Sequence, residues 1–177
     1  MDLNRGLFLS LNRLSGRWPM IDQAIYFLAE HAGWAIAGGL LVWWFAARSA
    51  AYRHRFQHVF VAGACAWLLV GVIKHVTHAD RPFVALTDVN QLVFNVRTYA
   101  FPSGHAALFA SLGAAVYWLH KKAGAGILAA AFFIGLARIA AGIHWPIDIA
   151  AGLALGMAVG TATMWATDRI DPPKPKS

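Results

Sequence analysis

Runs of apolar residues about as long as a lipid bilayer is thick limit the folds open to this chain. A transmembrane helix needs about 20 consecutive, predominantly apolar residues, and several runs approach that length. The 177 residues are 59% hydrophobic and only 13% charged, whereas about a quarter of the residues in soluble domains are charged. We therefore predict an all-α integral membrane protein with about five transmembrane helices.

Polar or basic segments separate the apolar runs and set the limits of the predicted spans. The five spans cover residues 21–45, 59–77, 103–119, 126–140 and 146–166. Ahead of them, residues 3–15 carry leucine and phenylalanine at helical spacing, with asparagine and arginine between. This segment is too short and too polar to span, and it predicts an interfacial amphipathic helix. Residues 168–177 form a tail, and the length fits one domain, residues 1–177.

Two of the connections between spans have a distinctive composition. Residues 48–58 are basic, and we expect them to form a loop between the first and second spans. Residues 78–101 form a longer connection that interrupts the apolar pattern with aspartate, arginine and asparagine. Long connections in compact folds are usually functional or disordered. The apolar residues within this one, such as Phe83 and Phe94, favour an ordered segment that faces the membrane.

The formal net charge of +7 does not indicate a nucleic-acid partner, because the basic residues lie at the ends of spans and not in one patch. Anionic lipid headgroups are the expected counterpart. Alternating the spans places residues 48–58, 121–122 and the tail on one side, which the positive-inside rule makes cytoplasmic. The opposite side carries nearly as many basic residues. The assignment therefore depends on Lys74, Arg81 and Arg138 belonging to a functional site.

The segment between the fourth and fifth spans has an arrangement typical of an activated histidine. Pro146 fits the first turn of a helix, so His144 falls just before that helix and Asp148 one turn inside it. The carboxylate then fixes one ring nitrogen as a donor and leaves the other free to attack or to bind. Arg138 lies across the intervening turn, placed to fork onto an oxyanion. Taken alone, the segment is equally compatible with a capped turn that holds a structural histidine.

Candidate functional residues gather at the non-cytoplasmic ends of the spans. They are Lys74, Arg81, Ser103, Gly104, His105, Arg138, His144 and Asp148. Three cations without enough carboxylates to balance them indicate an anionic ligand, and phosphate suits both arginine forks and the N–H groups at a helix start. One histidine is then placed to attack phosphorus while the other protonates the leaving oxygen. No cluster of aspartate and glutamate suggests a magnesium site, so we expect neither a metal nor a cofactor.

Three motifs resemble the signature of the type 2 phosphatidic acid phosphatase superfamily. They are Lys74-(six residues)-Arg81-Pro82, then Pro102-Ser103-Gly104-His105, and then Arg138-(five residues)-His144-(three residues)-Asp148. The resemblance implies a metal-independent phosphatase with a phosphohistidine intermediate. It maps His144 to the nucleophile, Asp148 to its orienting acid and His105 to the general acid. It maps Lys74, Arg81, Arg138, Ser103 and Gly104 to phosphate binding. The chain departs from the family pattern at Ala137, where the family usually has a serine hydroxyl that donates to phosphate.

Within this superfamily the chain looks most like the bacterial undecaprenyl pyrophosphate phosphatases. The five-span layout, the Arg81-Pro82-Phe83-Val84 run and Glu30 in the first span carry that resemblance. It implies hydrolysis of undecaprenyl pyrophosphate, a lipid held in the bilayer, for recycling of the cell-wall lipid carrier. It also implies a bacterial inner-membrane location with the active site on the periplasmic, outer face. Phosphatidic acid, phosphatidylglycerol phosphate and lipid A phosphates stay open as substrates.

Two further residues are candidate accessory groups, Glu30 in the first span and Arg97 in the long connection. A carboxylate within a span is costly and usually has a partner. Glu30 and Lys74 each lie about 15 residues from the cytoplasmic end of their spans, which puts both roughly 22 Å from that surface. Because the intervening loop is short, we predict that Glu30 approaches Lys74 or the bound headgroup. The other interpretation is a glutamate that faces a polar cavity without a part in catalysis.

Two other functions are compatible with parts of the pattern. A haem-binding membrane protein uses helix-end histidines as axial ligands, and a Soret band in the purified protein would reveal it. A lipid-phosphate carrier places charged residues near the membrane midplane between broken helices, whereas most charges here gather at one face. Release of phosphate from a lipid pyrophosphate distinguishes an enzyme from a carrier.

Overall fold

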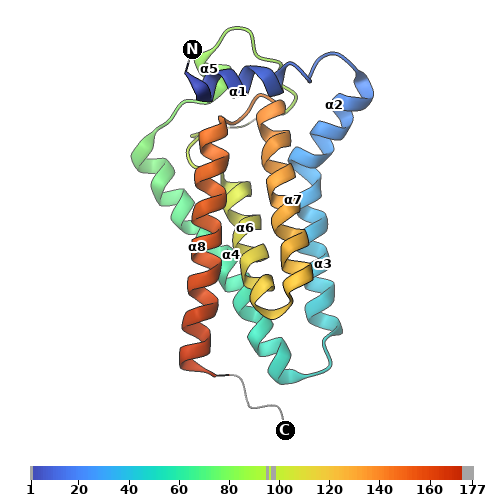
Figure 1. Cartoon of the computed structure of the whole chain (residues 1–177), viewed down its shortest axis with the longest axis vertical. Helices are drawn as coiled ribbons and strands as arrows, with labels where there is room; N and C mark the ends of the chain where they lie inside the picture. The colour runs from blue at the N-terminus through green and yellow to red at the C-terminus, as the bar shows by residue number, and fades with distance from the viewer. Residues whose placement is uncertain (1, 95, 97–98, 173–177) are drawn as a thin grey trace.

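Helix α6 (Gly104–Leu119) lies at the centre of the molecule, and the other long helices surround it (Figure 1). It packs against α4 (Ala50–Thr77), α7 (Lys121–Ala140) and α8 (Pro146–Ile170). The computed structural model describes residues 2–94, 96 and 99–172, and every regular element within those ranges is a helix. The all-α prediction is confirmed.

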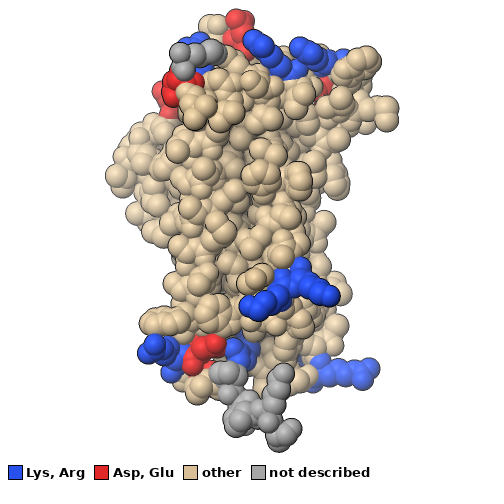
Figure 2. Space-filling model, in the orientation of Figure 1, with Lys and Arg blue, Asp and Glu red and all other residues tan. Residues whose placement is uncertain are grey.

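Four helical stretches are long and apolar enough to cross a bilayer. They are Pro19–Ala46, Ala50–Ala85, Lys121–Ala140 and Pro146–Ile170. Helix α6 is apolar but shorter, so the span predicted at residues 103–119 stays a prediction. On the face drawn in Figure 2, lysine and arginine lie toward the two ends of the molecule and leave a wide uncharged belt between them. This distribution is the one expected for a protein whose middle lies in hydrocarbon.

The contact between α6 and α8 is close because α8 presents glycine to its neighbour at every fourth position. A Cβ atom at Gly156 would lie 2.2 Å from the carbonyl oxygen of Ala107, and one at Gly152 would lie 2.6 Å from the carbonyl oxygen of Ser103. Small residues of this kind let helix backbones approach one another within a membrane. At the upper end of the contact, the Ser103 N–H donates to the Asp148 carbonyl at 3.0 Å. The first turns of the two helices are thereby joined.

Helix α1 (Leu3–Asn12) lies across the end of the bundle, above the turn between α7 and α8 (Figure 1). Phe8 is fully buried, and its ring centroid lies 5.1 Å from that of Trp145. Asn12 and Ser15 both donate to the Ala140 carbonyl, at 2.8 and 2.7 Å. The helix ends at Asn12 and not at residue 15, and its predicted place at the membrane interface stays a prediction.

A π-helical turn interrupts the first long helical stretch. Helix α2 (Pro19–Tyr26) leads into the π turn η1 (Phe27–His31), which leads into α3 (Ala32–Ala46). The Ala32 N–H donates to the carbonyl five residues back, at Phe27, in place of the usual four. Such turns are rare and are often found at functional sites.

The loop predicted at residues 48–58 is wrong, because α4 begins at Ala50 and includes most of that segment. Ser49 caps the helix, and its hydroxyl accepts a hydrogen bond from the Tyr52 N–H at 3.4 Å. Phe56 and Val59 are fully buried against the bundle. The apolar face of the second span therefore continues through the basic segment, whose charged side chains mask it in the sequence.

Two other predicted boundaries differ from those of the structure. Helix α7 begins at Lys121 and not at residue 126, because only His120 is extended between α6 and α7. Helix α8 continues to Ile170, past residue 166 and into the predicted tail. Asp168 in its last turn pairs with Arg55 and accepts a hydrogen bond from the Trp118 indole at 2.8 Å. The last part of the predicted tail, residues 173–177, lies outside the described residues.

A substitution of Gly156 with alanine tests the close contact between α6 and α8. The added methyl group meets the Ala107 backbone, so the helices must separate, and we expect the free energy of unfolding to fall by about 1–3 kcal/mol. Thermal unfolding in detergent measures the effect. Gly38→Ala in α3 is the control, because nothing lies within 4 Å of the added atom. Equal melting temperatures for the two variants would contradict the packing described here.

Candidate active site

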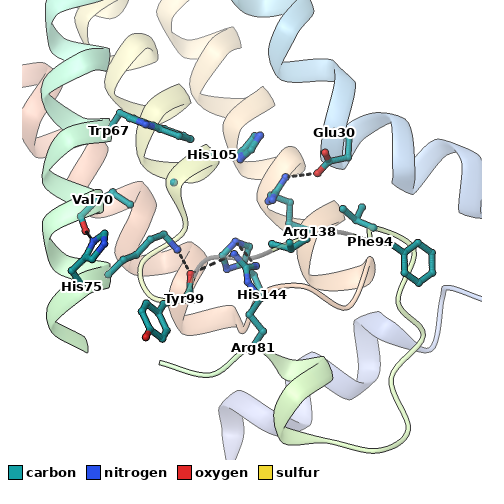
Figure 3. Close-up of a pocket in the computed structure, with 15 residues that line it drawn as sticks. Glu30, Trp67, Val70, His75, Arg81, Phe94, Tyr99, His105, Arg138 and His144 are labelled. Atoms are coloured by element: carbon teal, nitrogen blue, oxygen red, sulfur yellow. Dashed lines mark hydrogen bonds and ion pairs between the residues drawn. The ribbon is translucent and has the colours of Figure 1, made fainter. Parts of the chain in front are cut away.

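A cavity of about 780 Å³ lies near the α1 end of the bundle (Figure 3). Its walls come from α4, α6, α7, the π turn and the connection before α6. Seven of the predicted site residues line it, namely Glu30, Lys74, Arg81, Gly104, His105, Arg138 and His144. The structure therefore brings most of the candidates from three separate motifs into one place.

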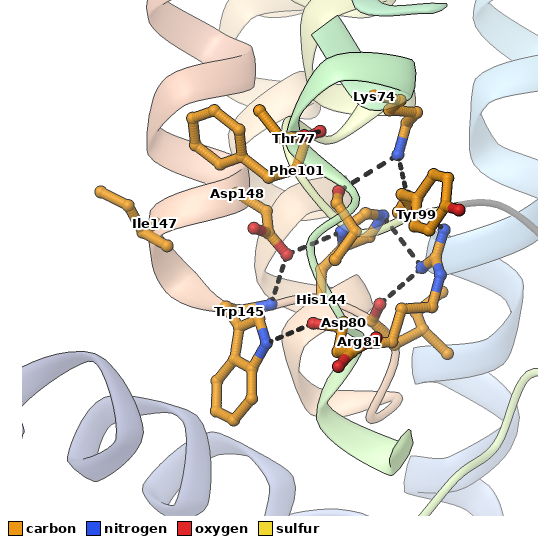
Figure 4. A network of polar contacts seen from close by, with 12 residues as sticks. Lys74, Thr77, Asp80, Arg81, Tyr99, Phe101, His144, Trp145, Ile147 and Asp148 are labelled. Atoms are coloured by element: carbon orange, nitrogen blue, oxygen red, sulfur yellow. Dashed lines mark hydrogen bonds and ion pairs between the residues drawn. The ribbon is translucent and has the colours of Figure 1, made fainter. Parts of the chain in front are cut away.

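His144 is held by Asp148 in the turn between α7 and α8. The Nδ1 atom of His144 lies 3.1 Å from Oδ2 of Asp148, and both side chains are 2% exposed. The Trp145 N–H donates to the same oxygen at 2.8 Å, which fixes the carboxylate at the start of α8 (Figure 4). A carboxylate acceptor keeps the ring proton on Nδ1 and leaves the lone pair on Nε2.

The turn that carries His144 depends on Gly142. This residue has a φ of +80°, a left-handed conformation that glycine adopts without strain. A Cβ atom there would lie 2.7 Å from the Asn90 carbonyl oxygen. The Ile143 N–H donates back to the Arg138 carbonyl at 3.2 Å. This hydrogen bond closes the turn, so Arg138 and His144 lie at the two ends of one short loop.

Arg81 lies directly beside the reactive edge of His144. It is 4% exposed and precedes the short helix α5 (Pro82–Ala85). Its Nη1 donates to the Ile143 carbonyl at 2.6 Å and lies 3.4 Å from Nε2 of His144. Its Nη2 donates to the Tyr99 carbonyl at 3.4 Å. The guanidinium therefore sits where an oxyanion bound at Nε2 would be neutralised.

Lys74 reaches the same group from the last turn of α4. Its ammonium donates to the carbonyl of Tyr99 and, at 3.1 Å, to the carbonyl of Ala100. The Tyr99 carbonyl thus accepts from both Lys74 and Arg81 (Figure 4). Backbone oxygens of the connection before α6 hold two cations that would otherwise repel each other.

Arg138 is bound by the π turn of the first helical stretch. Its Nη1 donates to the Ala29 carbonyl at 2.6 Å and to Oε1 of Glu30 at 3.1 Å. Glu30 therefore pairs with Arg138 and not with Lys74, and its predicted approach to the bound headgroup stays a prediction. Counting residues gives the position of Glu30 along its helix axis but not the direction in which its side chain points around that axis. The π turn packs on α7.

The start of α6 contributes His105 and Gly104 to the cavity, but not Ser103. The His105 ring packs edge-on against Trp67, with 6.4 Å between the ring centroids. A Cβ atom at Gly104 would lie 3.2 Å from the same indole. Ser103 is fully buried and outside the lining, and its hydroxyl has no hydrogen-bond partner within the described ranges.

The cavity residues that were not predicted include Trp67, His75 and Tyr99. Trp67 lies two helical turns before Lys74 on α4, so helical spacing contained a usable signal for it. The Nδ1–H of His75 donates to the Gly71 carbonyl at 2.7 Å. Tyr99 acts through its backbone carbonyl, which no side-chain pattern reveals. The predicted accessory residue Arg97 lies outside the described residues.

The environment of His144 favours the neutral form of its ring. Burial lowers the pKa of His144 well below its usual value, and the neighbouring cations Arg138, Arg81 and Lys74 lower it further. A neutral imidazole with its lone pair beside a cationic cavity is suited to attack an electrophile that carries negative charge. Within the described part of the chain, no group of three or more His, Cys, Asp or Glu residues gathers as a metal site.

Comparisons with known proteins find relatives of this chain. Residues 58–171 match the family described as the PAP2 superfamily. The chain is 32% identical over 169 residues to the bacitracin transport permease protein BcrC of Bacillus licheniformis, covering 96% of this chain and 83% of the relative. It is 25% identical to the undecaprenyl-diphosphatase BcrC of Bacillus subtilis (strain 168), covering 96% and 87%. The crystal structure of Aquifex aeolicus LpxE superposes with a TM-score of 0.74 at 26% identity, covering 93% and 96%.

Nuclear magnetic resonance titration of the histidine rings tests the electrostatics of the cavity. We expect His144 to stay neutral as the pH falls through its ordinary pKa of about 6.5. Because the Arg81 cation lowers that pKa, Arg81→Gln should raise it. Arg48→Gln, in the turn between α3 and α4, is the control and should leave it unchanged. A His144 ring that titrates at its ordinary pKa in the folded protein would contradict this account.

Proposed function

Because this chain belongs to the PAP2 superfamily of membrane lipid phosphatases, we propose that it hydrolyses undecaprenyl pyrophosphate through a phosphohistidine on His144. One observation carries the proposal. The Nε2 atom of His144, oriented through Nδ1 by Asp148, belongs to a cavity that also holds Lys74, Arg81 and Arg138. A nucleophile and a set of cations in one cavity suit transfer of a phosphoryl group.

In the first step, Nε2 of His144 attacks the terminal phosphorus of the lipid diphosphate. A bond forms between nitrogen and phosphorus, and the bond from phosphorus to the bridging oxygen breaks. The bridging oxygen leaves with the lipid monophosphate and takes a proton from His105. Asp148 holds the Nδ1 proton and stabilises the positive charge that develops on the ring.

In the second step, water hydrolyses the phosphohistidine. His105, now the base, takes a proton from the water as its oxygen attacks phosphorus. The bond between phosphorus and Nε2 breaks, and inorganic phosphate and neutral His144 are left. One water molecule is consumed, and the products are lipid monophosphate and phosphate.

The cations neutralise the phosphoryl oxygens during both steps. Arg81 is adjacent to Nε2, and Lys74 and Arg138 stand on other walls of the cavity. Three positive charges supply the stabilisation that a bound metal ion supplies in many phosphoryl transferases, so no metal is part of the proposed reaction. Ala137 has no hydroxyl group to donate to phosphate, so the arginines bind the phosphate in this protein.

The form of the cavity supports a lipid substrate with a phosphorylated headgroup. Trp67 and Phe94 line the cavity and are themselves 51% and 68% exposed, so apolar surface extends outward from the polar residues of the cavity. A polyprenyl chain can stay in the hydrocarbon while its diphosphate reaches His144. The Bacillus subtilis relative is named as an undecaprenyl-diphosphatase, which favours this substrate over phosphatidic acid, phosphatidylglycerol phosphate or a lipid A phosphate.

We place the active site at the outer, periplasmic face of a bacterial inner membrane. The cavity lies at the α1 end, whereas the turns between α3 and α4 and between α6 and α7 point to the opposite end (Figure 1). Arg48 lies in the first of these turns, and Lys121 begins α7 directly after the second. Lys74, Arg81 and Arg138 bind in the cavity and do not count as loop charge, so the positive-inside rule then favours this orientation.

Replacing His144 with alanine tests the covalent mechanism. Loss of the nucleophile should lower kcat for undecaprenyl pyrophosphate by roughly a thousandfold or more. His54→Ala, on the exposed surface of α4, should keep the wild-type rate. Phosphate release by purified protein in detergent measures both variants. Near-normal turnover by a folded His144→Ala protein would exclude the phosphohistidine.

A comparison of substrates on the wild-type protein tests the choice of lipid. We expect kcat/KM for undecaprenyl pyrophosphate to exceed that for phosphatidic acid by at least about tenfold. The physical reason is that a phosphate monoester is a good leaving group, so the first barrier is lower for a diphosphate. Phosphatidylglycerol phosphate and lipid A phosphate complete the set. A higher value for any of these three would replace undecaprenyl pyrophosphate as the substrate.

A further inference from the structure

Glu30 is a negative charge in a cavity built to bind an anion. Among the described residues that line the cavity, it is the only carboxylate, and it shares the walls with Lys74, Arg81 and Arg138. Asp148 is engaged with His144 behind the cavity and is not part of the lining. The reaction proposed above gives Glu30 no role. A carboxylate there opposes phosphate binding, so its presence needs a physical explanation.

The contacts of Glu30 place its carboxylate on the open side of Arg138. Its Oε1 lies 3.1 Å from Nη1 of Arg138, and the two side chains are 32% and 5% exposed (Figure 3). The Ala29 carbonyl holds the same Nη1 at 2.6 Å from the buried side. The π turn thus presents two successive residues to one nitrogen, a carbonyl behind it and a carboxylate toward the cavity.

A carboxylate and a phosphate use the same hydrogen-bond donors of a guanidinium. Glu30 therefore occupies a donor that a phosphate oxygen would use. Lys74 differs from Arg138 in this respect, because its partners are the neutral carbonyls of Tyr99 and Ala100. Neutral carbonyls carry less charge than a carboxylate and compete less strongly with an anion.

We propose that Glu30 competes with phosphate for Arg138 and so speeds release of the phosphate product. While phosphate is bound, the two anions repel each other across the guanidinium. Once phosphate departs, Glu30 takes its place on Nη1 and keeps the buried arginine paired. This inference rests on the proposed function, in which phosphate is a product formed in this cavity.

Coulomb's law gives the size of the expected effect. Two unit charges a few ångströms apart at the edge of a protein change a binding constant by roughly tenfold or more. Removing the charge of Glu30 should therefore tighten phosphate binding by about tenfold. The direction is diagnostic, because general damage to the fold weakens ligand binding and does not strengthen it.

The experiment compares Glu30→Gln, which keeps size and removes charge, with the wild-type protein. Binding of inorganic phosphate is measured by its effect on the melting temperature in detergent, which requires no turnover. Its inhibition constant is measured during hydrolysis of undecaprenyl pyrophosphate. Both the dissociation constant and the inhibition constant for phosphate should fall about tenfold.

Two further variants separate charge from shape. Glu30→Asp keeps the charge and should bind phosphate within about threefold of wild type. Asp88→Asn removes a carboxylate from the exposed connection before α6 and should change neither constant. If Glu30→Gln does not fold, Glu30→Ser takes its place with the same expected tightening.

The outcomes also separate this inference from the proposed function. Unchanged or weaker phosphate binding by the neutral variants, in a protein whose wild type hydrolyses the lipid, would overturn the role of Glu30 alone. The same tightening by Glu30→Asp would overturn it as well, because charge would not be the cause. A wild type that releases no phosphate from any lipid would refute the proposed function, while the binding comparison still tests the competition.

Discussion

Mutual repulsion among three cations is the constraint that the rest of this structure satisfies. Lys74, Arg81 and Arg138 come from distant parts of the sequence and converge on one cavity. Burying unpaired charge is costly, so each cation must be given a partner. Backbone carbonyls serve this purpose for Lys74 and Arg81, and the π turn supplies both a carbonyl and a carboxylate for Arg138.

The two carboxylates near the cavity have separate roles. Asp148 is buried and fixes the ring of His144, so its charge acts through the orientation of the histidine. Glu30 is more open and pairs with a cation, so its charge acts on the anion that the cation binds. The same chemical group thus supports nucleophilic attack in one position and, as we propose, product release in the other.

The helical bundle provides the rigidity that such a site needs. Glycines on α8 let it pack closely on α6, and a hydrogen bond from Ser103 to the Asp148 carbonyl joins their first turns. The histidines at the two helix starts are therefore placed by the same contact. The connection before α6 then folds over the cavity end and contributes the Tyr99 carbonyl to two cations. Backbone groups, more than side chains, hold the cations in position.

Much of this arrangement was predictable, because it depends on local spacing. The i, i+4 interval from His144 to Asp148 places both on one face, and Pro146 marks the start of α8. The apolar runs predicted an all-α membrane protein, and three motifs predicted the residues that meet in the cavity. Helix ends were less well predicted, since basic residues at 48–58 hid the buried face that starts at Phe56.

Only the tertiary structure decided which partner each charged group takes. Glu30 and Lys74 lie at similar heights by residue counting, yet Glu30 pairs with Arg138, because direction around a helix axis depends on packing and on the π turn. The carbonyl of Tyr99 has no signature in the sequence, since every residue carries one. Residue type and spacing therefore determined the chemistry available to this protein. The packing of α6 against its neighbours decided the geometry in which these residues come together.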